Sequence, residues 1–197
     1  MREDPSTAAP DTPGASTGGD TRPRPVLASV TVGALETRYA RAGRGATTVV
    51  IAPALDSLDA LQWTEQSIFH SIATSRRVLV ASPPTAIASR HGFSRWLTDF
   101  LDGIGIARTS IVATAMHALH ALHFSLHHGD RVERLMLVGS DSLAPDESVA
   151  GCIGDETMIG VPSVPILLVP GTLHHPSAAS RRAISRFLAE QGGDAVG

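Results

Sequence analysis

Histidine is the residue type that offers the most chemistry in this sequence. Nine histidines occur among 197 residues, and five of them lie in one stretch, at positions 117, 120, 123, 127 and 128. At about 100° per residue, His120, His123 and His127 fall on one stripe of a helix, where two or three imidazoles could bind a metal ion together. The alternative is a set of exposed or partly buried side chains on a helix that packs its other face on a sheet. The stretch contains neither an HExxH motif nor a carboxylate, so we predict no metal site.

Two further histidines and an aspartate follow predicted buried strands. His174 and His175 come after the run VPILLVP (164–170), and Asp141 comes after RLMLVGS (134–140). In a parallel sheet the carboxyl ends of the strands share one edge, and ligands bind at that edge. We therefore expect these three side chains at one place. The alternative is that they are ordinary solvated loop residues.

The remaining nucleophilic residues have no base at a recognisable spacing. Ser82 and Thr114 each stand at the end of a predicted strand, without a partner that the sequence identifies. Cys152 has no cationic neighbour to activate its thiol, so we interpret it as an ordinary loop residue. Because it is the only cysteine, a disulfide framework is excluded, and a reducing compartment, the cytoplasm, is expected.

Composition excludes two classes of partner. With 18% charged residues, a formal net charge of −3 and a pI near 6.3, the chain has no broad basic face for nucleic acid. It has no apolar run of about 18 residues, and its first 20 residues lack the apolar segment of a signal peptide, so we expect neither a membrane span nor export. Every basic residue is arginine, and lysine and asparagine are absent, a bias typical of GC-rich coding DNA. A bacterial source and a role in specialised metabolism are the associated expectations.

The order of predicted elements indicates one α/β domain. Residues 1–24 are rich in Pro, Gly, Ser and Thr and predict a disordered tail, residues 25–191 a folded domain, and residues 192–197 a short tail. Apolar, β-branched runs alternate with helical periodicity, as in a mostly parallel sheet covered by helices. Seven strands are predicted, at 26–32, 35–41, 47–53, 76–82, 109–115, 134–140 and 164–170. Four helices are predicted, at 61–75, 93–104, 116–128 and 180–190.

Several phrases in this order resemble the α/β-hydrolase superfamily, over roughly residues 26–190. VTVGALETRYARAGRGATTVVIAP resembles its opening hairpin and third strand, and LDALQW the stretch that follows the oxyanion loop. RWLTDFLDGIGIARTSIVATAMHALHAL resembles the helix, the fifth strand and the nucleophile elbow. DRVERLMLVGSDS and VPSVPILLVPGTLHHP resemble the sixth strand and the seventh strand with its acid turn. The resemblance implies a mostly parallel sheet of about seven strands with flanking helices, a reduced α/β-hydrolase fold.

The elbow departs from the superfamily pattern at every informative position. G-x-S-x-G corresponds to ATAMH (113–117), so the nucleophile position holds Ala115, whose methyl group cannot attack a carbonyl. Both glycines are replaced, by Ala113 and His117, although they normally allow a strained nucleophile between strand and helix. The resemblance therefore predicts a relaxed elbow and no serine hydrolase chemistry.

The other catalytic positions depart as well. The oxyanion loop holds Ala52 and Pro53, and a proline has no N–H to donate. The acid position holds His174, and no eighth strand with its histidine is recognisable after the seventh. The 20 residues between Ser140 and Val161 are too few for a lid domain. We expect an open site or one covered by a partner.

Residues implied for a surviving site gather around this mouth. In some members the acid has moved to the end of the sixth strand, so Asp141 with His174 or His175 would form an oriented general base. His117, beside the old nucleophile, is the alternative base. The implied pocket consists of Ala52, Pro53, Asp56, Trp63, Ser82, Thr114, Ala115 and Met116.

Three functions remain open at this point. The first is a non-hydrolytic acid–base enzyme of lyase, cyclase or decarboxylase type on a small organic substrate, with no cofactor. The second is an inactive relative that binds a ligand or a protein partner, and the third is a hydrolase whose triad is rebuilt from other positions. An unpaired edge on the seventh strand also predicts a homodimer.

Overall fold

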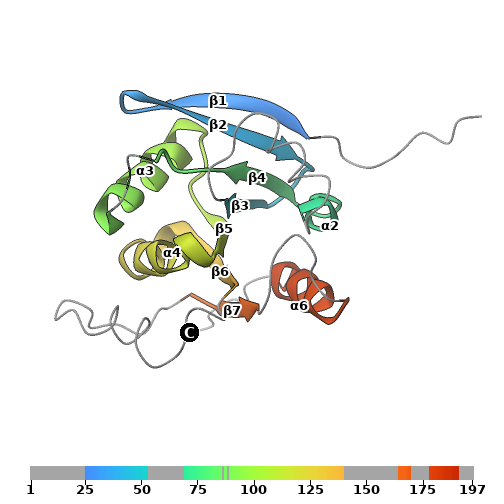
Figure 1. Ribbon diagram of the computed structural model, residues 1–197. Helices are drawn as coiled ribbons and strands as arrows, with labels where there is room; N and C mark the ends of the chain where they lie inside the picture. Colours follow the sequence, from blue (N-terminus) through green and yellow to red (C-terminus); the bar gives the residue numbers. More distant parts are fainter. Residues whose placement is uncertain are drawn as a thin grey trace, which may run out of the picture.

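A seven-stranded sheet forms the centre of the protein. The computed structural model describes residues 25–52, 69–85, 87, 89–139, 164–169 and 178–190. The strands follow the order β1-β2-β4-β3-β5-β6-β7 across the sheet (Figure 1). Their bounds are β1 Val26–Val32, β2 Leu35–Ala42, β3 Thr47–Ile51, β4 Arg77–Ala81, β5 Thr109–Thr114, β6 Val132–Val138 and β7 Ile166–Val169. The predicted tails 1–24 and 192–197 lie outside the described residues.

Pairing within the sheet is mixed, with a parallel majority. β1 and β2 form an antiparallel hairpin, in which Gly33 takes a φ of +60° at the first turn position. β2 pairs antiparallel with β4, whereas β4, β3, β5, β6 and β7 are parallel to one another. The carboxyl ends of five neighbouring strands therefore lie along one edge.

Helices cover both faces of the sheet (Figure 1). α3 (Arg90–Gly103) and α4 (Ala115–His127) pack on one face, and α2 (Phe69–Ala73) and α6 (Ala178–Ala189) pack on the other. Alternate strand residues supply the two cores: Ile111 and Ala113 face α3 and α4, whereas Val112 faces the side of α2 and α6. A short 3-10 turn, η1 (Gly129–Arg131), connects α4 to β6.

The predicted elements are confirmed in type and order, with shifts at their ends. All seven strands are present, and the four α-helices of the described residues match the four predicted. α3 begins at Arg90 rather than at residue 93, because the Ser89 hydroxyl accepts a hydrogen bond from the Gly92 N–H and caps the helix. Ala115 begins α4 instead of ending β5. Of the predicted helix 61–75, residues 69–75 are described, and the helix among them covers Phe69–Ala73.

None of the described helices is long and apolar enough to cross a membrane.

Candidate active site

The carboxyl edge of the parallel strands is built by their register. Ile51 pairs with both Ala81 and Ala113, so β3, β4 and β5 end at the same level. The N–H of Ala52 donates to the carbonyl of Ala81 over 3.0 Å, which fixes the exit of β3 beside that of β4. On the other side, the Gly139 N–H donates to the Val169 carbonyl over 3.1 Å. The edge therefore brings Ala52, Ser82 and the β5–α4 junction together.

The junction between β5 and α4 is relaxed. Thr114 is extended, with a φ of −87° and a ψ of 163°, and the helix begins at the next residue, Ala115. None of the described non-glycine residues has a positive φ, so no strained residue separates strand from helix. The sequence analysis expected a relaxed junction at this position. The side chains of Ala115 and Met116 lie outside the described part of the structure.

The hydroxyl groups at this edge donate to backbone carbonyls. Ser82 donates to the Pro83 carbonyl over 3.4 Å, and Thr114 donates to the Ile51 carbonyl over 3.4 Å. Within the described residues neither hydroxyl is hydrogen-bonded to an imidazole or a carboxylate. An activated hydroxyl nucleophile needs such a base.

His117 stands in the first turn of α4, next to the edge, and turns toward α3. Its half-buried ring stacks on Phe93 with ring centroids 6.0 Å apart, and His120 stacks on the same phenyl ring at 5.4 Å. Burial lowers the pKa of His117, and the neighbouring imidazole of His120 lowers it further. His117 is therefore neutral at pH 7, so it can accept a proton or donate one hydrogen bond.

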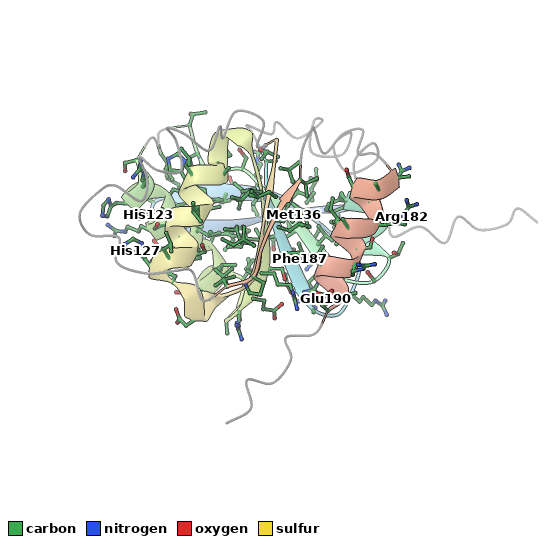
Figure 2. The ribbon with its side chains drawn as sticks, turned by 90° about the horizontal axis from the view of Figure 1, so that it is seen from below. His123, His127, Met136, Arg182, Phe187 and Glu190 are labelled. Carbon is green, nitrogen blue, oxygen red and sulfur yellow. The ribbon has the colours of Figure 1, made fainter. Side chains whose placement is uncertain are left out.

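A second imidazole group lies further along α4. His123 and His127 stack with ring centroids 4.2 Å apart, and His91 of α3 meets His123 edge-on at 5.6 Å. Figure 2 shows His123 and His127 on α4, across the sheet from Phe187 of α6 and from Glu190, which follows that helix. The stripe predicted on this helix is confirmed for these two residues.

Hydrogen bonds orient these rings. The Nδ1–H of His127 donates to the His123 carbonyl over 2.9 Å, and the Nδ1 of His123 lies 3.4 Å from the hydroxyl of Ser94. Burial lowers the pKa of His123 to about 4, with further lowering by His127, His91, Arg90 and His120, in that order. At neutral pH this imidazole carries no charge.

The contacts of His123 with His91 and Ser94 join α3 to α4. Among the described residues, no three His, Cys, Asp or Glu side chains are arranged to hold a metal ion. His91 was not singled out by the sequence analysis, because the predicted helix began at residue 93, and Ser94 lies inside that helix without a motif that marks it. The sequence signal for the earlier start of this helix was Ser89, a residue type that caps helices, placed shortly before the first apolar residue of the helix.

Six predicted site residues stay predictions. Pro53, Asp56, Trp63, Asp141, His174 and His175 all lie outside the described residues. The pairing of Asp141 with either histidine is therefore an expectation from the sequence alone. Of the twelve predicted site residues, four have side chains that the structure describes: Ala52, Ser82, Thr114 and His117.

No protein-family model matches the chain, and no curated protein matches its sequence. Solved structures do resemble it. Naproxen esterase (carboxylesterase NP) from Bacillus subtilis is 15% identical with a TM-score of 0.55, over 84% of this chain and 81% of that one. Carboxylesterase CesB (YbfK) from Bacillus subtilis is 17% identical with a TM-score of 0.50, over 58% of this chain and 43% of that one. An epoxide hydrolase mutant from Vigna radiata is 14% identical with a TM-score of 0.50, over 59% and 39%.

These similarities define the fold. The strand order, the helices on both faces and the structural neighbours agree on a reduced α/β-hydrolase fold, as the sequence predicted. The matched region spans less than half the length of the last two structures. At such identities a shared fold does not transfer an activity.

Proposed function

We propose that this protein is a non-hydrolytic acid–base enzyme of lyase, cyclase or decarboxylase type, acting on a small organic substrate at the carboxyl edge of its sheet. One observation carries the proposal: α4 begins at Ala115 directly after β5, so the usual nucleophile position offers a methyl group on unstrained backbone. Reactions that move a proton need an oriented base and no covalent nucleophile.

The bases of this proposal are His117 and the sequence-predicted group of His174, His175 and Asp141. His117 supports it because its imidazole stays neutral at pH 7 and stands one turn from the edge. Burial lowers the pKa of His117 and so favours the unprotonated imidazole, the form that accepts a proton. Asp141 would orient whichever of the two following histidines it meets.

Two experiments test the absence of hydrolysis and the presence of another activity. The purified protein should neither turn over a short-chain p-nitrophenyl ester nor react with a fluorophosphonate. Metabolites of the source strain should be compared with and without the gene, after complementation by wild type, His117→Gln, or a His174→Ala/His175→Ala double variant. We expect one compound to accumulate on deletion and only the wild type to clear it.

His128→Gln is the matched control for the His117 variant. His128 follows α4 at its other end, where it stacks on Phe124 with ring centroids 4.7 Å apart. It should complement like the wild type. Labelling by the fluorophosphonate, or full complementation by both the His117 and the double variant, would overturn the proposal.

An inactive ligand- or partner-binding protein is the second candidate. The observation in its favour is that, within the described residues, both edge hydroxyls donate to backbone carbonyls and His117 packs on Phe93. Such a protein would leave the metabolite profile unchanged on deletion. We also propose a cytoplasmic location, because a single cysteine fits a reducing compartment.

A homodimer through β7 completes the proposal. Within the described residues β7 pairs with β6 alone, and its Leu168 is 59% exposed. Unpaired strand edges with apolar side chains recruit further strands. A second copy of the chain would extend the sheet across this edge.

A further inference from the structure

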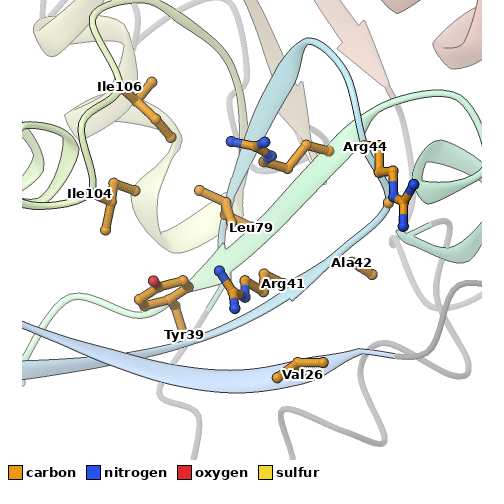
Figure 3. A pocket seen from close by; sticks show the side chains of 10 residues that line it. Val26, Tyr39, Arg41, Ala42, Arg44, Leu79, Ile104 and Ile106 are labelled. Carbon is orange, nitrogen blue, oxygen red and sulfur yellow. The ribbon is translucent and has the colours of Figure 1, made fainter.

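A separate pocket lies at the opposite end of the sheet from the candidate active site. Ala42 at the end of β2 pairs with Val78 at the start of β4, so the pocket is at the amino-terminal ends of the parallel strands. Its volume is about 460 Å³, within the range of small-molecule sites. Figure 3 shows Tyr39, Arg41 and Leu79 on one side of it, with Ile104 and Ile106 across from them.

Three arginines line this pocket: Arg41, Arg44 and Arg77. Their side chains are exposed, and within the described residues none of them has an ion-pair or hydrogen-bond partner. Two other arginines, by contrast, lie beside carboxylates: Arg76 is 3.2 Å from Glu133 and Arg131 is 2.7 Å from Asp102.

The surrounding charge makes this grouping informative. None of the ten described residues that line the pocket is acidic, although the chain as a whole has a formal net charge of −3. Three like charges at one opening repel each other, and an anion placed between them removes that repulsion. The guanidinium group also matches the planar geometry of a carboxylate or the oxygens of a phosphate.

Backbone geometry holds the arginines in place. Arg41 and Leu79 are direct partners across the antiparallel β2–β4 pair, and Arg77 and Leu79 point to the same face of β4 because side chains alternate. Gly43, with a φ of +72°, lets the loop that carries Arg44 approach the turn at Ala73–Arg76, which leads into β4. A Cβ there would come within 2.1 Å of the Arg76 carbonyl oxygen, so only glycine fits.

The rest of the lining is apolar. Ile106 and Leu79 are buried in the core that α3 covers, and Tyr39 meets Phe100 edge-on with ring centroids 5.5 Å apart. The side chains of this wall pack on the core from behind, so their rotamers are restricted before a ligand binds. A ligand that fits both parts has a charged head and an apolar body.

We propose that this pocket binds an amphipathic organic anion, with a carboxylate or phosphate head between Arg41, Arg44 and Arg77 and an apolar body against Ile104, Ile106 and Leu79. The site is distinct from the carboxyl edge and does not depend on the function proposed for that edge. Binding weakens as salt rises, because the arginines are exposed to solvent.

Calorimetric titration of the full chain tests this with hexyl phosphate, hexanoate, hexanol and inorganic phosphate. We expect at least one of the two amphipathic anions to bind about tenfold or more tightly than hexanol and inorganic phosphate. The comparison of hexyl phosphate with hexanoate identifies the preferred head. In ¹H–¹⁵N NMR spectra, the amides of residues 41–44, 77–79 and 104–106 should shift with the bound anion.

Two triple variants remove the same charge from different places. Arg41→Gln/Arg44→Gln/Arg77→Gln should weaken binding about tenfold or more, while Arg181→Gln/Arg182→Gln/Arg186→Gln on α6 should change it less than about twofold. Both should keep the wild-type unfolding midpoint, because all six side chains are exposed. Equal loss in both variants, no loss in the first, equal binding of hexanol, or no binding of either amphipathic anion would overturn the proposal.

Discussion

Arg76 connects four elements through one guanidinium group, so its replacement by methionine tests what holds the amino-terminal ends of the strands together. Its Nε donates to the Thr48 hydroxyl of β3 over 3.0 Å, and its Nη1 donates to the Leu188 carbonyl of α6 over 2.6 Å. Its Nη2 reaches the Ser110 hydroxyl of β5 at 3.3 Å and the Glu133 carboxylate of β6 at 3.2 Å.

The expected cost of Arg76→Met follows from burial. The Arg76 side chain is 13% exposed and that of Glu133 is 37% exposed, so water can reach only one partner freely after the substitution. Removing one member of a fully buried pair costs about 3–5 kcal/mol, whereas an exposed pair is worth about 0–1 kcal/mol. Because Arg76 is mostly buried and Glu133 is partly exposed, we expect Arg76→Met to lower the free energy of unfolding by about 2–4 kcal/mol.

Urea unfolding followed by circular dichroism measures this loss. Arg95→Met is the matched control, since Arg95 is 87% exposed and its Nε lies 3.9 Å from the Asp99 carboxylate; its effect should stay below about 0.5 kcal/mol. Arg76→Lys keeps the charge but loses the forked geometry, so its loss of unfolding free energy should lie between the losses of the two methionine variants. If Arg76→Met unfolds like Arg95→Met, the four contacts contribute no net stability and the reasoning is refuted.

Three further predictions concern other parts of the molecule. The pKa of His123 is lowered from 6.5 to about 4, so between these pH values the unfolded chain binds more protons than the folded chain. The contribution of His123 to the free energy of unfolding is therefore complete above pH 6.5, and on the order of 1 kcal/mol is lost as the pH falls toward 4. His123→Gln should remove this part of the slope in urea titrations at several pH values, and an unchanged slope would contradict it. Phe93→Ala removes a buried ring that contacts two imidazoles and should cost about 3–5 kcal/mol, whereas a loss below about 1 kcal/mol would show that the site collapses around the gap. Leu168→Glu should convert a dimer to a monomer in light scattering, and a monomeric wild type would exclude the proposed edge pairing.

The strands could be predicted from sequence because their residue types admit few alternatives. TTVVI and RVLVA are short, β-branched and apolar, and their burial on both faces is what a central parallel strand requires. Helix ends were less certain, because the apolar pattern of α3 starts at Phe93 while the cap that starts the helix is Ser89. A periodic pattern reports the buried face and not the first turn, where side chains are solvated.

The edge of the sheet was predictable, but contacts across helices were not. The strand-end positions of Ala52, Ser82 and Thr114 follow from the order of elements alone. The meeting of His91 with His123 depends on how α3 crosses α4, which no local pattern specifies. Arg41 and Arg77 are likewise brought to one pocket by the β2–β4 register, between strands that are far apart in sequence.

Arg76 and Arg77 show how neighbouring residues of one type take different roles. Arg76 turns toward α6 and is hydrogen-bonded on that side, whereas Arg77 lines the pocket and has no such partner among the described residues. Side chains alternate along an extended chain, so the two guanidinium groups leave the backbone in opposite directions. If the pocket serves an anion, Arg76→Gln should lower stability while the folded fraction still binds, and Arg77→Gln should lower affinity at unchanged stability. A shared loss of stability would instead mean that both arginines contribute to the structure of the sheet.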